Sequence, residues 1–124
     1  MDKSYISGSS LKVWRDFFPN AEILGADIDK ESLLSENRSK CFFIDQIDTI
    51  SIKNFWLETK FHKNSVNLII DDGFHDYQAN INLFEGSIDF LKSDGFYFIE
   101  DVHEDQLELY FNYFENSIYN SYFF

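Results

Sequence analysis

Four short apolar runs in this chain each end in acidic residues, and stretches with helical patterning separate them. The runs are AEILGAD (21–27), CFFID (41–45), VNLIIDD (66–72) and FYFIED (96–101). This alternation predicts parallel strands joined by helical crossovers. VNLIIDD is apolar on both faces, which is typical of a central parallel strand.

The segments between these runs predict helices. We expect them over residues 11–18, 30–37, 49–59, 77–91 and 104–119. Ser9 or Ser10 is expected to cap the first helix and Asp29 the second. Ser93-Asp94-Gly95 is predicted to be a turn into the last strand.

Apolar residues at helical spacing predict which faces of the last two helices point inward. The expected inward residues are Ile81, Phe84, Ile88 and Leu91, then Leu107, Phe111, Phe114 and Ile118.

The predicted strand ends carry five aspartates: Asp27, Asp45, Asp71, Asp72 and Asp101. The carboxyl ends of parallel strands share one edge of a sheet, where open α/β sheets bind ligands. We therefore expect these aspartates to converge there. A row of carboxylates suits cations, sugar hydroxyls or amines, and it repels a bare phosphate.

Composition narrows the class of protein and of partner. With 124 residues and 44% hydrophobic content, the chain is long enough for one domain, taken as residues 1–124. A net charge of −12 disfavours nucleic acid and anionic membranes as partners. The single cysteine, Cys41, and the lack of an apolar leader or a membrane-length run indicate a cytoplasmic protein.

The strongest local signal is the segment Asp71-Asp72-Gly73-Phe74-His75-Asp76, which links a predicted strand to a predicted helix. Asp72 and His75 are three residues apart, so both side chains can face one ligand. A carboxylate there can bind a divalent cation, and a nearby imidazole can remove a hydroxyl proton. The alternative is that Asp76 caps the helix and His75 is a solvated loop residue.

Asp101 follows the last predicted strand. Strand alternation turns Glu100 and Asp101 to opposite faces, so one of them can meet Asp72 across the ligand edge. The alternative is a strand-end carboxylate in water. His103 could serve as a second base or be an ordinary surface histidine.

Two further acidic positions suggest nucleotide binding. An acid at the position of Asp27 accepts hydrogen bonds from ribose hydroxyls in nucleotide-binding α/β domains. Asp45 and Gln46 can form hydrogen bonds to an exocyclic amine or to the edge of a nucleotide base. The alternative is that they only mark the end of a strand.

Three segments together resemble one family. GSSLKVWRDFFPNAEILGADID, CFFIDQID and LIIDDGFHDYQANINLFEGSIDFLKSDGFYFIEDV are similar to class I S-adenosylmethionine-dependent methyltransferases. Within that class they most resemble the metal-dependent sugar O-methyltransferases of macrolide biosynthesis. The resemblance covers about residues 8–103. It implies an α/β fold, a Rossmann-like three-layer sandwich with a mostly parallel sheet.

The resemblance also implies roles for the residues that match its motifs. Asp27 would hold the cofactor ribose, Asp45 with Gln46 would lie near the adenine, and Gly8 and Ser9 would match the end of the glycine loop around the methionine part.

For the methyl acceptor, the resemblance implies that Asp72 and Asp101 bind Mg²⁺. The ion would also coordinate two hydroxyls of a small-molecule acceptor such as a sugar. His75 would be the general base. A metal lowers the pKa of a bound hydroxyl, so His75 could take its proton.

The chain also departs from the family pattern. Only residues 1–7 precede Gly8, so the family's first strand and half of its glycine loop have no counterpart. The strands after Asp101 and an upstream third metal carboxylate have none either. We therefore expect an incomplete domain, apparently truncated at both ends, in which two strands each lose a ladder partner.

Two other functions fit parts of the sequence. The missing glycine loop and the many late aromatic residues fit a catalytically inactive remnant that forms a homo-oligomer or binds a partner. Asp27-Ile-Asp29 and Asp71-Asp72 resemble motifs of haloacid-dehalogenase-like phosphatases. Lys30 stands where that family has Thr or Gly.

Overall fold

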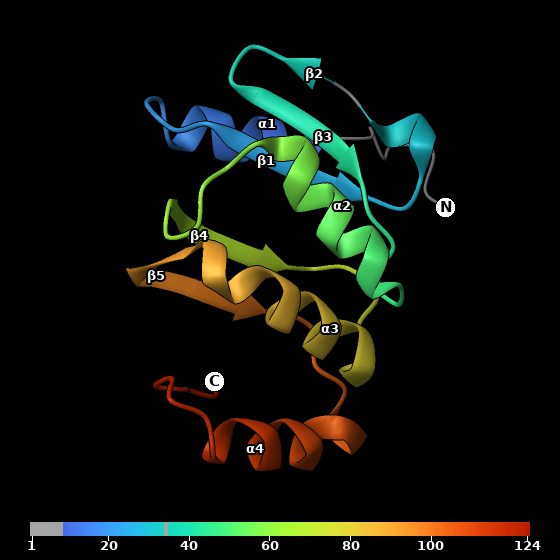
Figure 1. The fold of residues 1–124 in the computed structure, drawn as a ribbon, viewed down its shortest axis with the longest axis vertical. Helices are drawn as coiled ribbons and strands as arrows, with labels where there is room; N and C mark the ends of the chain where they lie inside the picture. The colour runs from blue at the N-terminus through green and yellow to red at the C-terminus, as the bar shows by residue number, and fades with distance from the viewer. Residues whose placement is uncertain (1–8, 34) are drawn as a thin grey trace. The chain divides into compact units, whose positions relative to one another are not determined.

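The computed structural model describes residues 9–33 and 35–124, which form two compact units, Met1–Lys60 and Phe61–Phe124. The first unit contains α1 (Ser9–Phe17), β1 (Ile23–Asp27), η1 (Lys30–Ser32), β2 (Ser35–Glu36), β3 (Ser39–Phe43) and α2 (Thr49–Thr59). The second contains β4 (Val66–Asp71), α3 (Tyr77–Ser87), η2 (Ile88–Phe90), β5 (Leu91–Ile99), η3 (Glu104–Gln106) and α4 (Leu107–Glu115). The chain is α/β, as its sequence predicts (Figure 1).

The first unit is built on a three-stranded sheet with the order β1-β3-β2. β1 and β3 are parallel, with Ile23 opposite Ser39 and Asp27 opposite Phe43. α1 approaches β1 closely at Gly25, where an added Cβ would lie 2.5 Å from Leu11 Cδ1. Glycine at this position therefore lets the helix pack onto the strand.

The predicted helix over residues 49–59 is confirmed as α2. The Asp48 side chain caps it by accepting a 2.9 Å hydrogen bond from the Ile50 N–H. Ile52, Phe55 and Trp56 are buried on one side of the helix. The helix ends at Lys60, whose left-handed φ of 59° closes the last turn.

The predicted helix over residues 30–37 is wrong beyond its first turn. Asp29 does cap a helical turn, accepting from the Glu31 N–H at 2.9 Å, but that turn is the short η1. The chain then forms β2, which pairs antiparallel with β3 through Ser35 and Lys40. Strand pairing, which local pattern does not show, outweighs helical propensity here.

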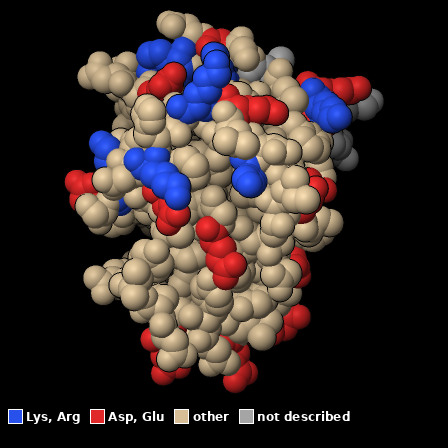
Figure 2. Space-filling view, viewed as in Figure 1, with Lys and Arg blue, Asp and Glu red and all other residues tan. Residues whose placement is uncertain are grey.

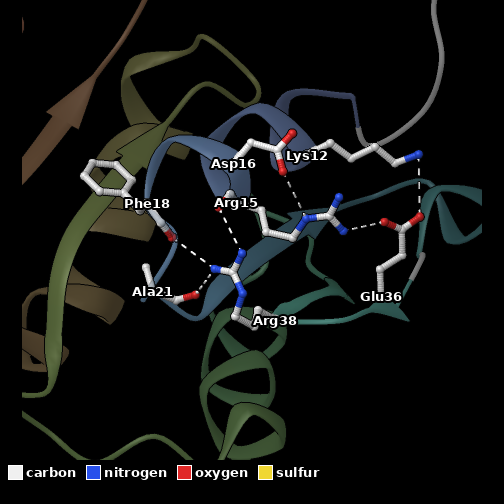
Figure 3. Close-up of polar contacts among 7 residues, drawn as sticks. All are labelled: Lys12, Arg15, Asp16, Phe18, Ala21, Glu36 and Arg38. Atoms are coloured by element: carbon white, nitrogen blue, oxygen red, sulfur yellow. Dashed lines mark hydrogen bonds and ion pairs between the residues drawn. The ribbon is translucent and has the colours of Figure 1, made fainter.

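Arg38, in the turn between β2 and β3, ties this hairpin to α1 (Figure 3). Its guanidinium donates to the carbonyls of Phe18 and Ala21 at 3.0 Å each, and to that of Arg15 at 3.2 Å. Carbonyls at a helix C-terminus lack helical partners, so these bonds satisfy them. Arg15 donates to Glu36 at 2.8 Å, and this bond lowers the pKa of the Glu36 carboxyl.

Replacing Arg38 with alanine should destabilise the first unit by about 2 kcal/mol, because three hydrogen bonds from a charged donor are lost. Both tryptophans of the chain, Trp14 and Trp56, lie in this unit. Urea unfolding followed by tryptophan fluorescence therefore reports on it. Lys40→Ala is the matched control, since Lys40 is an exposed cation two residues away. Equal stability of the two variants would contradict the role given to Arg38.

The second unit is built on the parallel pair β4–β5, with Ile69 opposite Tyr97 and Asp71 opposite Ile99. The predicted turn at residues 93–95 is wrong, because these residues lie within β5 and are accommodated by a shift of register between Val66 and Leu68. Gly95 permits the irregularity, since a Cβ there would lie 2.9 Å from the Asn67 carbonyl oxygen.

α3 confirms the predicted start at Tyr77 but ends before residue 91, and Leu91 begins β5 instead. Ile81 and Phe84 are buried, as expected. The Phe84 ring is in edge contact with Tyr97, at a centroid distance of 5.1 Å, and with Phe114, also at 5.1 Å. These rings join α3 to β5 and to α4.

The predicted last helix is too long, and its inward face is partly wrong. α4 ends at Glu115, and its buried residue is Tyr110. Phe111 is 43% exposed and Ile118, beyond the helix, is 92% exposed. The helix is turned so that the Tyr110 hydroxyl meets a polar partner on α3, which apolar spacing alone does not indicate.

Among the described residues, β1 is paired only with β3 and β4 only with β5, so each stands at the edge of its sheet. No helix in the described ranges is long and apolar enough to cross a membrane.

Candidate functional site

Three side chains that the sequence singles out meet in the second unit: Asp72, His75 and Asp101. One ligand atom from each lies within 4.8 Å of the others. Asp72 directly follows β4 and Asp101 lies two residues beyond β5. Because these strands are parallel neighbours, their carboxyl ends bring the two aspartates together, as their positions in the sequence predict.

His75 is half-buried and turned toward Asp72. Its Nε2 lies 3.6 Å from Asp72 Oδ1, and its Nδ1 is buried with no hydrogen-bond partner among the described residues. Asp76 does cap α3, accepting from the Gln78 N–H at 3.1 Å. The capping role and the ligand-facing role are therefore compatible, and His75 is not simply a solvated loop residue.

The backbone is unusual at two members of this cluster. His75 has φ 56° and Asp101 has φ 51°, both in the left-handed region. Such conformations cost on the order of 1–3 kcal/mol each and tend to occur at functional sites, where the surroundings hold them. The sequence carries only a weak signal for this, since Asp and His adopt this region more readily than most residues.

Asp71, which we expected at the ligand edge, turns away from the cluster and is 1% exposed. Its Oδ2 accepts from Asn80 Nδ2 at 2.7 Å and its Oδ1 from the Gly73 N–H at 3.3 Å. The Tyr110 hydroxyl donates to Asn80 Oδ1 at 2.5 Å. Asp71 is thus part of a buried polar network directly beneath the turn that carries Asp72 and His75.

Burial and then the nearby Asp71 carboxylate raise the pKa of Tyr110 to about 12, which keeps its hydroxyl a donor at neutral pH. Sequence reasoning missed Asn80 and Tyr110. Both lie on helices whose packing decides which residues meet, and no local motif marks them.

The Asp72–His75–Asp101 cluster has the donors that a divalent cation requires. Two carboxylates supply hard oxygen ligands of the kind that Mg²⁺ and Mn²⁺ prefer. The His75 imidazole faces these carboxylates through Nε2, which lies 3.6 Å from Asp72 Oδ1. The residues present therefore fit a cation held by Asp72 and Asp101 with His75 beside it.

In the first unit, Asp27 and Asp45 lie at the carboxyl ends of neighbouring parallel strands. Asp27 pairs with Phe43, and Asp45 is two residues beyond Phe43. Asp27 Oδ1 accepts from the Asp29 N–H at 2.9 Å, and Asp45 Oδ1 accepts from the Ile47 N–H at 3.1 Å. These local bonds orient both carboxylates through one oxygen each, and the second oxygen can accept bonds from a ligand.

The structure gives less detail for the other site residues that the sequence suggests. Gln46 is buried immediately after Asp45. Ser9 is the first residue of α1, and its side chain is outside what the structure describes. Gly8 lies outside the described residues altogether. His103 is exposed at the start of η3 and is not part of the cluster.

Comparison with known proteins gives relatives of one kind. The chain is 30% identical over 95 residues to the 8-demethyl-8-(2-methoxy-alpha-L-rhamnosyl)-tetracenomycin-C 3'-O-methyltransferase of Streptomyces olivaceus. It is also 30% identical over 95 residues to the mycinamicin VI 2''-O-methyltransferase of Micromonospora griseorubida. Each alignment covers 77% of this chain and 23% of the relative.

Comparison with solved structures also finds a methyltransferase. The MycE methyltransferase of the mycinamycin biosynthetic pathway, in complex with Mg and SAH, matches with a TM-score of 0.67 and 28% identity. The match covers 81% of this chain and 26% of that one. The chain is a relative of the sugar O-methyltransferases. A second structure of the same enzyme, which also holds mycinamycin VI, gives the same TM-score.

The sugar O-methyltransferase relationship confirms the resemblance seen in the sequence and the Rossmann-like α/β fold class. No family model matches the chain. The chain spans about a quarter of the length of the sugar O-methyltransferases that it matches.

Proposed function

We propose that this chain carries the cofactor-binding and metal-binding elements of an S-adenosylmethionine-dependent O-methyltransferase whose acceptor is a hydroxyl of a small molecule such as a sugar. The observation that carries the proposal is the Asp72–His75–Asp101 cluster. Its support is the similarity to the MycE methyltransferase, whose solved structures hold Mg and SAH.

Asp72 and Asp101 are the proposed ligands of Mg²⁺. A bound ion supplies Lewis acidity, which lowers the pKa of a coordinated acceptor hydroxyl. The carboxylates leave the strands β4 and β5 side by side, so the sheet itself sets their spacing. The left-handed backbone at Asp101 turns its side chain back toward Asp72 rather than along the strand.

His75 is the proposed general base. Asp72 lies 3.6 Å from its Nε2, close enough to orient the ring and to stabilise it once protonated. In this role the imidazole would take the proton of the acceptor hydroxyl. S-adenosylmethionine, when bound, would supply the methyl group, so that the acceptor becomes a methyl ether and S-adenosylhomocysteine is released.

The cofactor would be held by residues of the first unit. Asp27 is proposed to accept hydrogen bonds from the ribose hydroxyls, and Asp45 with Gln46 to lie near the adenine. Gly8 and Ser9 are proposed to lie at the methionine part. The geometry of Asp27 and Asp45, on adjacent strand ends with one carboxylate oxygen each turned into a local bond, supports the first two assignments.

Binding of S-adenosylhomocysteine tests this proposal directly. Wild type should show a saturable change of thermal stability by tryptophan fluorescence, because a ligand that binds the folded state stabilises it. Asp27→Asn should weaken the affinity about tenfold or more, because a charged acceptor of hydrogen bonds is lost while the bond to the Asp29 N–H can remain.

Glu22→Gln is the matched control, since it removes the same charge just before the opposite end of β1. No response in wild type would remove the cofactor role of this chain. Equal affinity of Asp27→Asn and Glu22→Gln would remove the role of Asp27.

A second candidate function rests on exposed apolar surface. Ile118 is 92% exposed and Tyr122 is 76% exposed, and both follow α4. Such surface favours self-association or a protein partner, as expected for a catalytically inactive remnant. A tight oligomer by size-exclusion chromatography, together with no response to S-adenosylhomocysteine, would favour this function over methyl transfer. The phosphatase alternative has no comparable support, because Asp29 is engaged as the cap of η1.

A further inference from the structure

η3 and α4 are bonded at two points to the first turns of α3, which directly follow the Asp72–His75 turn. At one point, the Tyr110 hydroxyl donates to Asn80 Oδ1. At the other, Gln106 Oε1 accepts from the Tyr77 N–H at 3.0 Å, while Gln106 Nε2 donates to Asp76 Oδ1 at 3.1 Å. The Tyr77 and Tyr110 rings also meet edge to face, with centroids 5.1 Å apart.

The first fastening reaches the candidate site through Asp71. Asn80 holds one carboxylate oxygen of Asp71 at 2.7 Å, and the other oxygen accepts from the Gly73 N–H, within the turn itself. The Asp71 carbonyl accepts from the Glu100 N–H at 3.0 Å, next to Asp101. One buried residue therefore connects both chain segments that carry the cluster.

The second fastening reaches the site through Asp76. Asp76 immediately follows His75, and its hydrogen bond from Gln106 is the main cause of the lowered pKa of its carboxyl. Gln106 itself lies five residues after Asp101. The bond from Gln106 to Asp76 thus closes a loop between the segment that carries His75 and the segment that carries Asp101.

The left-handed backbone at His75 and Asp101 explains why such fastening is needed. A strained conformation persists only when the surrounding contacts over-determine it. Among the described contacts that flank these residues in the second unit are the bonds of Gln106 to Asp76 and Tyr77 and those of Asp71 to Asn80, Gly73 and Glu100.

We propose that Tyr110 and Gln106 are positioning residues: through Asn80, Asp71 and Asp76 they hold Asp72, His75 and Asp101 in the arrangement that binds a divalent cation. The inference rests on the proposed function, because it concerns the same site. It adds that η3 and α4, which follow Asp101, help to arrange the site although none of their residues is in the cluster.

The test compares two tyrosines on one helix. Tyr110→Phe removes the hydroxyl that bonds to Asn80, whereas Tyr113→Phe removes a hydroxyl that bonds to the exposed Glu85 at 2.8 Å. Affinity of the full chain for Mn²⁺ alone is measured by electron paramagnetic resonance at a temperature where all variants are folded. Tyr110→Phe should bind about tenfold more weakly, the range seen for residues that orient metal ligands, and Tyr113→Phe should match wild type.

Gln106→Ala provides a second, independent variant if Tyr110→Phe does not fold, and it should also bind about tenfold more weakly. A readout within the site separates positioning from plain stability. In wild type, bound Mn²⁺ should broaden the NMR signals of the His75 ring far more than those of His103, and this contrast should shrink in the two variants.

Affinity and broadening that stay at wild-type values in both Tyr110→Phe and Gln106→Ala, with only the melting temperature lowered, would overturn the positioning role and leave the proposed metal site standing. If wild type itself binds no Mn²⁺, the metal part of the proposed function fails, and the positioning role fails with it.

Discussion

Replacing Asp72 with asparagine should lower the affinity of the chain for Mn²⁺ about 100-fold or more, since even outer-shell changes at metal sites cost 10–100-fold. The amide would keep the shape of the side chain but lose the negative charge that a hard cation prefers. Asp101→Asn should have an effect of the same size, because the two carboxylates are expected to share the ion. Binding is measured by electron paramagnetic resonance of Mn²⁺, whose signal Mg²⁺ should compete away.

An acidic protein also attracts cations without a specific binding site, and this attraction would add to the measured binding of Mn²⁺. Residues 61–124 contain twelve acidic residues and only two basic ones, Lys63 and Lys92. Over α4, the charged side chains visible in Figure 2 are acidic. Measurements at about 0.15 M salt reduce this attraction, because the Debye length is then about 8 Å.

Asp105→Asn controls for the remaining attraction. Asp105 is exposed in η3, in the same unit, and its loss changes the net charge by the same amount. A specific site predicts wild-type binding in Asp105→Asn and loss in Asp72→Asn. If all three aspartate variants lose affinity equally, the cluster is only one part of an acidic surface.

The parts of the site that the sequence predicted are those fixed by strand ends. Parallel strands place their carboxyl ends on one edge, so an acidic residue just beyond an apolar run has its position set by the sheet. Asp72 and Asp101 follow this rule in the second unit, and Asp27 with Asp45 follow it in the first. The sequence also predicted local capping by Asp29 and Asp76, which the structure confirms.

The features that the sequence did not predict depend on tertiary contacts. Residues 30–37 have helical patterning, yet β2 forms because β3 offers it a strand partner. The inward face of α4 is set by the bond from Tyr110 to Asn80 rather than by its apolar stripe. Likewise, the sequence does not show which of Asp71 and Asp72 is buried, and in the structure it is Asp71 that bonds to Asn80 while Asp72 faces the cluster.

The ligands of the candidate site are brought together by the parallel strands that they follow. Their exact placement depends on the buried polar network around Asp71 and on the strained backbone at His75 and Asp101. Buried networks of this kind are stable only when every member is satisfied. Substitutions in this network should therefore lower the stability of the second unit more than substitutions of exposed residues.

Asn80→Ala should destabilise the second unit by roughly 3–5 kcal/mol, because two buried hydrogen bonds are lost and one of them is to a carboxylate. Asn80 is 1% exposed, and its amide both donates to Asp71 and accepts from Tyr110. Its loss removes a hydrogen bond to the Asp71 carboxylate and the acceptor of the Tyr110 hydroxyl. Asn82→Ala on the same helix is the control, since Asn82 accepts a bond from Gln78 in an exposed setting and should cost less than about 1 kcal/mol.

Tryptophan fluorescence cannot report this loss, because both tryptophans lie in the first unit. Amide hydrogen exchange of β4 and β5 resolves it, since exchange there should accelerate strongly in Asn80→Ala and little in Asn82→Ala. Adding Asp71→Asn to Asn80→Ala removes the buried charge and should restore part of the lost stability, a coupling that a double-mutant cycle measures. If the double variant is as unstable as the sum of the single variants, the penalty arises from lost packing and not from the lost hydrogen bond between Asn80 and Asp71.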